Sequence, residues 1–155
     1  MVLNVSKQLQ PFVRQYLSNL DLSNFLGVSL TLKHQVDHQN LDPMLCSQNL
    51  RHFMNVLNKG VYGNRFSRYG IKLQIFPVLE KSSGYRLHYH LIIEHPRELP
   101  LIRFKDLIRS SWIKTRFGHR EIHIDDSIDH GWIHYITKFQ SMTDQVDWEN
   151  VHLNR

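Results

Sequence analysis

The sequence predicts an α+β domain in which helices pack on a central antiparallel sheet. Segments that alternate polar and apolar residues, typical of half-buried strands, lie between segments with helical spacing. Two of the strand segments are joined by a short turn and are therefore expected to form a hairpin. Hairpin strands mixed with single helices are typical of an α+β sandwich. We expect the helices on one face of the sheet and a ligand on the other.

The composition fits one globular domain over residues 1–155. Of these residues 41% are hydrophobic, and 19 Lys and Arg face 14 Asp and Glu, which gives a formal net charge of +5. This balance favours a polyanionic partner. Cys46 is the single cysteine and excludes an intrachain disulfide, and no apolar run approaches the ~20 residues of a membrane span. The first ten residues lack the apolar core of a signal peptide, so we expect a cytoplasmic protein.

The first half of the chain predicts a helix, a strand and a second helix. Pro11 is tolerated in the first turn of the first helix. The strand alternates strictly between apolar and polar residues, and an Asp-Pro pair at 42–43 opens the second helix. A segment rich in Gly, Arg and aromatic residues then predicts a loop. These elements cover residues 11–20, 26–34, 43–59 and, for the loop, 60–70.

The second half predicts a hairpin, a helix, a short strand and a last helix. Ser83-Gly84 is a strong turn signal, and Pro77, which cannot donate to a ladder, marks an edge or a bulge. Gly118 ends the third helix. Residues 142–155 form a polar tail that we expect to pack loosely. The other elements cover residues 71–80, 87–94, 104–117, 121–125 and 129–141.

A His-Tyr-His sequence lies in the second strand of the hairpin. Residues two apart in a strand point to the same face, so His88 and His90 project together. Because the chain has 11 histidines, the spacing alone carries little weight. A three-residue loop at 83–85 puts Glu80 opposite His88 with Cβ atoms ~5 Å apart, whereas a two-residue loop turns it away. Two imidazoles and a carboxylate suit Mn²⁺, Mg²⁺ or a similar Lewis acid.

A second pattern places Tyr135 and Lys138 three residues apart on the last predicted helix, and therefore on one face. A phenol is a poor nucleophile at neutral pH because it ionises near pH ~10. It becomes reactive when a cation polarises the electrophile or a nearby positive charge favours the phenolate. Tyr-x-x-Lys is also common on helices, where the tyrosine borders a core and the lysine is solvated.

Three patterns in this order resemble the HUH endonuclease superfamily, specifically its single-tyrosine rolling-circle replication initiators. They are VSLTLK at 28–33, HYH at 88–90 and YITK at 135–138, so the resemblance spans most of the chain. The resemblance implies a ferredoxin-like or RRM-like antiparallel sheet. It also implies a divalent metal, Mn²⁺ or Mg²⁺, bound by His88, His90 and the acid Glu80. Tyr135 is then the nucleophile, and Lys138 assists at the phosphate.

The activity implied by this resemblance is nicking and joining of single-stranded DNA through a 5′-phosphotyrosine intermediate. The implied role is to initiate rolling-circle replication in the cytoplasm of a bacterial host. The implied partners are single-stranded DNA at an origin, near a hairpin, and a host helicase and polymerase, since we expect no helicase domain in this chain. Single-tyrosine transposases and relaxase-like nickases of the superfamily use related chemistry, and these alternatives stay open.

Basic residues supply candidate DNA contacts. The segment 62–69 interleaves arginines with aromatic rings, a mixture that single-strand binders use. One further histidine alternates with Asp125 on the polar face of its strand and is a candidate neighbour of the site. A non-catalytic RRM-like nucleic-acid-binding module, the other alternative, would instead expose sheet aromatics such as Tyr89 or Phe76. The candidate contacts are Lys33, Arg65, Arg68, Arg86 and His123.

Overall fold

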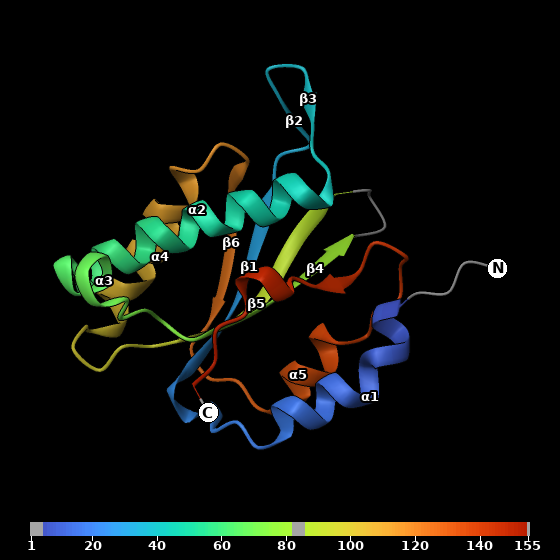
Figure 1. The fold of residues 1–155 in the computed structure, drawn as a ribbon, viewed down its shortest axis with the longest axis horizontal. Helices are drawn as coiled ribbons and strands as arrows, with labels where there is room; N and C mark the ends of the chain where they lie inside the picture. The colour runs from blue at the N-terminus through green and yellow to red at the C-terminus, as the bar shows by residue number, and fades with distance from the viewer. Residues whose placement is uncertain (1–4, 82–85, 155) are drawn as a thin grey trace.

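The computed structural model describes residues 5–81 and 86–154. At its centre lies a five-stranded antiparallel sheet with strand order β6-β1-β5-β4-β7 (Figure 1), which confirms the α+β class. The helices are α1 (Val5–Ser18), α2 (Pro43–Tyr62), α3 (Asn64–Tyr69), α4 (Leu101–Ile113) and α5 (His130–Ile136), with short 3₁₀ turns at Leu22–Asn24 and Trp148–Asn150. The strands are β1 (Phe25–Leu32), β2 (Gln35–Val36), β3 (Gln39–Asn40), β4 (Ile75–Lys81), β5 (Leu87–Glu94), β6 (Gly118–Asp125) and β7 (Gln145–Val146).

The order of elements along the chain is compatible with a ferredoxin-like fold. The series β1, α2, β4, β5, α4, β6 is a βαββαβ arrangement, and its strands lie in the spatial order β6-β1-β5-β4. Helix α1 precedes this series, and α5 and β7 follow it. The strand that carries the His-Tyr-His sequence, β5, is central and pairs with β1 on one side and β4 on the other.

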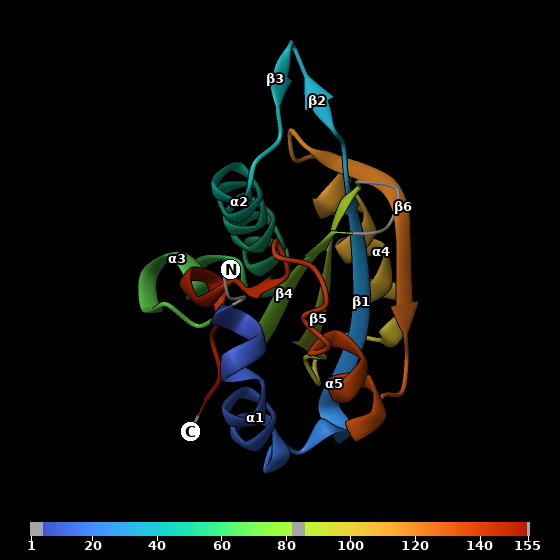
Figure 2. The same ribbon diagram turned by 90° about the vertical axis from the view of Figure 1, so that its right-hand side faces the viewer.

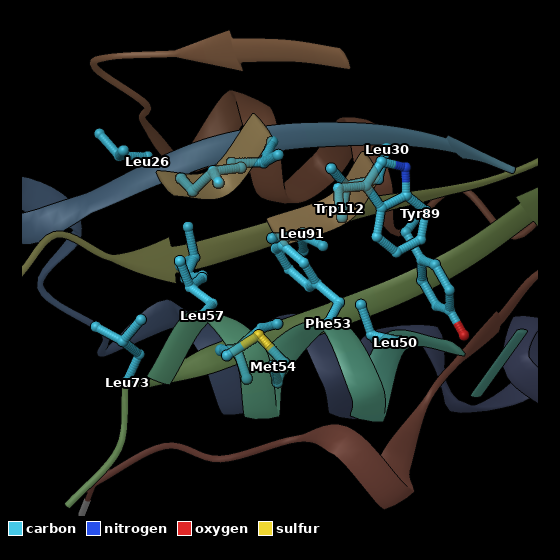
Figure 3. Close-up of a cluster of buried hydrophobic side chains, with 14 of the residues drawn as sticks. Leu26, Leu30, Leu50, Phe53, Met54, Leu57, Leu73, Tyr89, Leu91 and Trp112 are labelled. Carbon is cyan, nitrogen blue, oxygen red and sulfur yellow. The ribbon is translucent and has the colours of Figure 1, made fainter. Parts of the chain in front are cut away.

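One face of the sheet carries the larger hydrophobic core, against α2 and α4 (Figure 3). The predicted alternation of β1 is confirmed here, since Val28, Leu30 and Leu32 are all fully buried in this core. Phe53 of α2 and Trp112 of α4 meet edge to face, with ring centroids 5.4 Å apart. These contacts fix both helices on the same side of the sheet.

The opposite face is not free of helices, so that expectation is wrong. Helices α1 and α5 cover part of it and form a second core (Figure 2). The physical reason lies in the strands themselves, because Phe76 of β4 and Ile92 of β5 point to this face and need an apolar cover. Farther along the same face the side chains become polar, at Glu80, His88 and His90, and these lie beyond the second core.

Several helix boundaries differ from the expectation. Helix α1 begins at Val5, so Pro11 lies inside it, not in its first turn. The segment expected to be a loop is mostly helical: α2 continues to Tyr62 and α3 follows at once. Two of its glycines, Gly63 and Gly70, lie at helix ends, where they have φ values of 57° and 68°. Helix α5 ends at Ile136, five residues before the expected end at 141.

Strand boundaries also shift. Strand β4 begins at Ile75 instead of 71. Helix α4 runs from Leu101 to Ile113 instead of 104–117, and Gly118 opens β6 where it was expected to end the helix. A Cβ at this glycine would clash with the carbonyl oxygen of Trp112, so only glycine permits the sharp return from α4. Strand β5 has the predicted bounds.

The polar tail does not pack loosely. Its strand β7 pairs with β4, where Val146 lies opposite Val78, and the N–H of Asp147 donates to the carbonyl of Pro77. The backbone of Pro77 thus faces β7, and its missing donor does not interrupt the ladder with β5. The polar residues of the tail suggested loose packing, but the carboxylate of Asp147 is buried and forms hydrogen bonds within the protein.

Asp147 joins the tail to the central strand. The Tyr89 hydroxyl donates to its Oδ2 atom over 2.8 Å, and the Ser47 hydroxyl and the Asn150 amide donate to the same carboxylate. Burial and the adjacent carboxylate raise the pKa of Tyr89, which keeps its hydroxyl a donor. Three hydrogen-bond donors offset the cost of burying the charged carboxylate of Asp147.

The structure also bears on Cys46 and on membrane-spanning helices. The thiol of Cys46 lies in the larger core, where burial raises its pKa to about 12, and it is therefore a packing residue. Among the described residues, no helix combines the length and the apolar character needed to cross a bilayer.

We expect Tyr89→Phe to lower the free energy of unfolding by about 1.5–3 kcal/mol, because it removes a buried hydrogen bond to a carboxylate. Urea denaturation measures this change. The matched control is Tyr69→Phe, whose ring is 74% exposed and whose replacement should change stability by less than about 0.5 kcal/mol. Equal effects of the two substitutions would contradict a stabilising role for the bond to Asp147.

Candidate metal and nucleophile site

Glu80, His88 and His90 come together on the partly open face of the sheet. The pairing of β4 with β5 puts Glu80 opposite His88, as predicted from the longer loop, although the turn residues 82–85 lie outside the described part of the chain. The Nε2 atoms of the two histidines are 3.0 Å apart. The Glu80 carboxylate oxygens lie 3.3 Å from Nε2 of His90 and 3.8 Å from Nε2 of His88.

These three side chains fit a divalent metal ion. Their potential ligand atoms all lie within 4.8 Å of one another. Adjacent ligands at about 2.1 Å from an octahedral ion lie about 3 Å apart, close to the separations found here. Two imidazoles and one carboxylate on one side of an ion leave its other positions for water or a substrate oxygen. The group can therefore bind a metal ion, and the donor set alone does not select one metal.

The charges of the cluster suit metal binding at neutral pH. Burial, together with the charge of His90, lowers the pKa of His88 despite the nearby carboxylate. Burial alone would raise the pKa of Glu80, but the hydrogen bond with His90 and the charges of His90, His88 and Lys138 outweigh it and lower that pKa. A carboxylate and a neutral imidazole are the forms that coordinate a cation.

Ser29 orients one ligand, and the sequence did not single it out as a site residue. Its hydroxyl lies 2.9 Å from Nδ1 of His90, since Ser29 and His90 are directly paired between β1 and β5. This hydrogen bond leaves Nε2 of the same ring directed toward the cluster. A partner on the second ring nitrogen is typical of metal-binding histidines. The sequence feature that could have indicated this role is the position of Ser29 as a small polar residue on the alternating strand.

Tyr135 of α5 faces the same cluster. Its ring centroid lies 5.3 Å from that of His90 and 5.5 Å from that of Trp132, and Trp132 also contacts His90 at 5.8 Å. The phenol side chain is 43% exposed, so it remains accessible. A segment 45 residues after His90 is thus brought to the metal ligands, as the sequence proposed.

A glycine permits this approach. A Cβ at Gly27 of β1 would lie 2.8 Å from Ile128 and 2.9 Å from the indole of Trp132. With glycine there, Trp132 of α5 can pack directly against β1. The position of Tyr135 therefore depends on Gly27, which has no functional side chain.

Lys138 follows the helix and does not lie on it, because α5 ends at Ile136. Its Nζ atom nevertheless lies 4.4 Å from the centroid of the Tyr135 ring, so the expected neighbourhood of the two residues is found. Helix α1 holds this segment in place: the side chains of Lys7 and Gln10 donate to the Lys138 carbonyl, over 3.1 and 3.3 Å, and Arg14 donates to that of His134.

Of the candidate DNA contacts, three lie near the cluster. Lys33 is exposed just beyond the end of β1, and Arg86 precedes β5, where it pairs with Glu121 over 3.3 Å. His123 lies opposite Ser29 on β6, shares the face of His90 and contacts Asp125 over 3.1 Å. These residues thus lie on the side of the cluster that faces β1 and β6.

The structure does not bring Arg65 and Arg68 to the site. Both lie on α3, which leads through Leu73 to the beginning of β4, whereas Glu80 lies at the other end of that strand. Arg65 lies over the ring of Tyr62 at 5.2 Å. A DNA path past these arginines to the metal ligands, as the interleaved sequence suggested, is not supported by this placement.

Comparison with protein families, with curated proteins and with solved structures finds no match for this chain.

We expect Gly27→Ala to destabilise the protein by about 1–3 kcal/mol, because the new Cβ overlaps Ile128 and Trp132. Urea denaturation measures the loss. Gly60→Ala is the matched control: a Cβ there meets only Leu107 at 3.5 Å, and alanine in a helix should stabilise by about 0.5–1 kcal/mol. The interpretation of Gly27 fails if its substitution is neutral.

We expect Mn²⁺ to raise the melting temperature, since a ligand at a hundredfold excess over its Kd adds about 2.7 kcal/mol to stability. The rise should disappear in His88→Ala and His90→Ala and persist in His123→Ala, whose imidazole lies off the cluster. It should shrink at acidic pH, where protons compete for the imidazoles. Scanning calorimetry with and without Mn²⁺ tests this, and an unchanged rise in His90→Ala would disprove the site.

Proposed function

We propose that the protein is a metal-dependent nickase and strand transferase for single-stranded DNA. The observation that carries this proposal is the convergence of a tyrosine ring, a lysine and a two-histidine, one-glutamate cluster on one face of the sheet. These groups come from β4, β5 and the α5 segment, so the fold, not local sequence, brings them together. Such a set supplies a nucleophile and the charge that phosphoryl transfer requires.

Each group has a role in the proposed reaction. Glu80, His88 and His90 would hold the divalent ion, which when bound polarises an oxygen of the scissile phosphate as a Lewis acid. The Tyr135 oxygen forms a bond to phosphorus while the bond from phosphorus to the 3′ oxygen breaks. The phenol gives up its proton to solvent, and the departing 3′ oxygen takes up a proton. The products are a 5′-phosphotyrosine and a free 3′-hydroxyl.

Lys138 would stabilise the negative charge that this transfer spreads over the phenolic and phosphoryl oxygens. Its ammonium group lies over the ring of Tyr135, and its charge helps to lower the pKa of Glu80, so it is close to both the proposed nucleophile and the cluster. A preorganised cation at developing charge contributes strongly to transfer reactions.

The surroundings leave room for a strand of DNA. A hollow of about 490 Å³ opens beside Tyr135, lined also by Trp132, Ile128 and Asp125. The net charge of +5 favours a polyanion. Phe76 and Tyr89, the aromatic residues that a non-catalytic RRM-like module would expose, are both fully buried. A site built on stacking against the open sheet is therefore the weaker proposal.

Initiation of rolling-circle replication is the role that the motif order favours. In that role the released 3′-hydroxyl primes synthesis, and reversal of the tyrosine transfer closes the circle. A single-tyrosine transposase would use the same residues but join two different DNA ends. The products on a circular single-stranded substrate distinguish these roles, since an initiator should regenerate circles.

The direct test is a covalent adduct. With Mn²⁺ and a random-sequence pool of single-stranded DNA labelled at the 3′ end, the label should become bound to the protein. Tyr135→Phe should abolish the adduct, and Tyr69→Phe, on the exposed surface of α3, should leave it unchanged. Denaturing electrophoresis measures the product.

The same assay tests the role of charge. Lys138→Ala should slow adduct formation by about a hundredfold, and Lys138→Arg should restore much of the rate. An adduct that persists in Tyr135→Phe would show that the nucleophile is another residue.

A further inference from the structure

We propose that the outward face of helix α1 is a contact surface for a second copy of this chain. Val5, Leu9 and Phe12 lie on this face at helical spacing and are exposed, the side chain of Phe12 by 62%. The side of the helix that faces the protein already has its own apolar residues, Val13 and Leu17, which are buried in the second core. A second, exposed apolar stripe on the same helix marks an interaction surface. This inference does not depend on the proposed nickase activity.

A hollow of about 510 Å³ continues this face and makes its shape self-complementary. It opens where α1 lies next to the C-terminal segment (Figures 1 and 2), and its lining includes Phe12, Tyr16 and Asn19 on the helix and Leu153 on the tail. An exposed aromatic ring therefore lies at the edge of a hollow on the same surface. A two-fold axis can place the Phe12 ring of each copy in the hollow of the other, which is the reciprocal contact that symmetric dimers use. This reciprocity favours a second copy over an unrelated protein.

The distribution of charge also favours a second copy. Among the described residues of α1, the charged ones are Lys7 and Arg14, and both point toward the end of α5, where they donate hydrogen bonds. The polar residues that border the apolar stripe are Gln8 and Gln15. Their amides donate and accept hydrogen bonds and can therefore pair with their own counterparts. Two chains of net charge +5 meet no like charges at this face, and a polyanion finds no cation on it.

The size of the patch predicts a weak dimer. Tyr16 extends the stripe to Trp148 of the tail, whose ring centroid lies 6.3 Å away and whose side chain is 46% exposed. Buried aromatic side chains cover 150–250 Å², so the exposed parts of Phe12 and Trp148 amount to roughly 100 Å² each. With the aliphatic residues the apolar patch reaches roughly 300 Å², well below the ~800 Å² per partner of a stable complex. We therefore expect a Kd on the order of 10–100 µM.

Dimer formation would also support the segment that carries Tyr135. Of the fourteen residues of α1, only Val13 and Leu17 are buried, yet the helix holds the end of α5 through hydrogen bonds from Lys7, Gln10 and Arg14. A second copy on the outward face would bury part of the remaining apolar surface of α1. Amide hydrogens of α1 should therefore exchange more slowly at high protein concentration than at low concentration.

Sedimentation velocity between about 1 and 500 µM tests the proposal. The wild-type protein should move from the monomer mass of 18.5 kDa toward twice that mass as its concentration rises. Phe12→Glu should weaken association at least tenfold, because it places a charge in an apolar contact, and Phe12→Leu should retain most of it. Ile102→Glu is the matched control, since Ile102 is an equally exposed apolar residue on α4, and it should leave association unchanged.

Salt distinguishes this dimer from association through bound nucleic acid. Raising NaCl from 50 to 500 mM should strengthen the dimer or leave it unchanged, because salt screens the repulsion between two positively charged chains. Association that weakens with salt, or that nuclease treatment removes, would show that nucleic acid joins the copies and would overturn the proposal. So would a dimer that persists in Phe12→Glu. A chain that stays monomeric up to 500 µM would show that a second copy does not occupy this face.

Discussion

The antiparallel pairing of β4 with β5 is the constraint on which the candidate site depends. It places Glu80 beside His88, and a slip of one residue would turn the carboxylate to the other face of the sheet. The tail helps to fix this register from the far side of β4: the Asp144 carboxylate accepts the N–H of Lys81, directly after Glu80, and Val146 continues the ladder. The C-terminal tail contains none of the three candidate ligands, but it helps to hold Glu80 in the position where it meets the two histidines.

Strand β5 has one face on the partly open side of the sheet and the other in the larger core. His88 and His90 point to the partly open face, while Tyr89 between them is buried in the larger core and bonded through its hydroxyl to Asp147. The Tyr89 ring packs in the core, and its hydroxyl forms a buried hydrogen bond. Both interactions fix the backbone of β5, which carries the two imidazoles on its other face. Ser29 then orients one imidazole from the neighbouring strand. Ordered supports of this kind keep ligands in place before a cation binds.

Local signals explain what the sequence could predict. The alternation in β5 and the Asp42 cap of α2 depend on neighbouring residues, and both are found. The structure has the hairpin register of the longer of the two loops that the sequence left open. The tail could not be predicted, because β7 forms only when β4 offers an edge, and its polar residues gain partners only in the folded chain. Asp37 and His38 are not a typical turn pair, so the small hairpin of β2 and β3 carried no turn signal. The place of Arg65 depends on the topology, which no local pattern encodes.

The position of Tyr135, the proposed nucleophile, depends on the surroundings of a short helix. Helix α5 has seven residues, too few to be stable alone, so its geometry must come from its surroundings. Gly27 lets Trp132 approach β1 closely, and Arg14 and Gln10 of α1 donate to the carbonyls near the end of α5. The backbone is thus fixed on two sides, while the Tyr135 ring stays half exposed. A fixed backbone combined with an accessible side chain is the arrangement that the proposed nucleophilic role of Tyr135 requires.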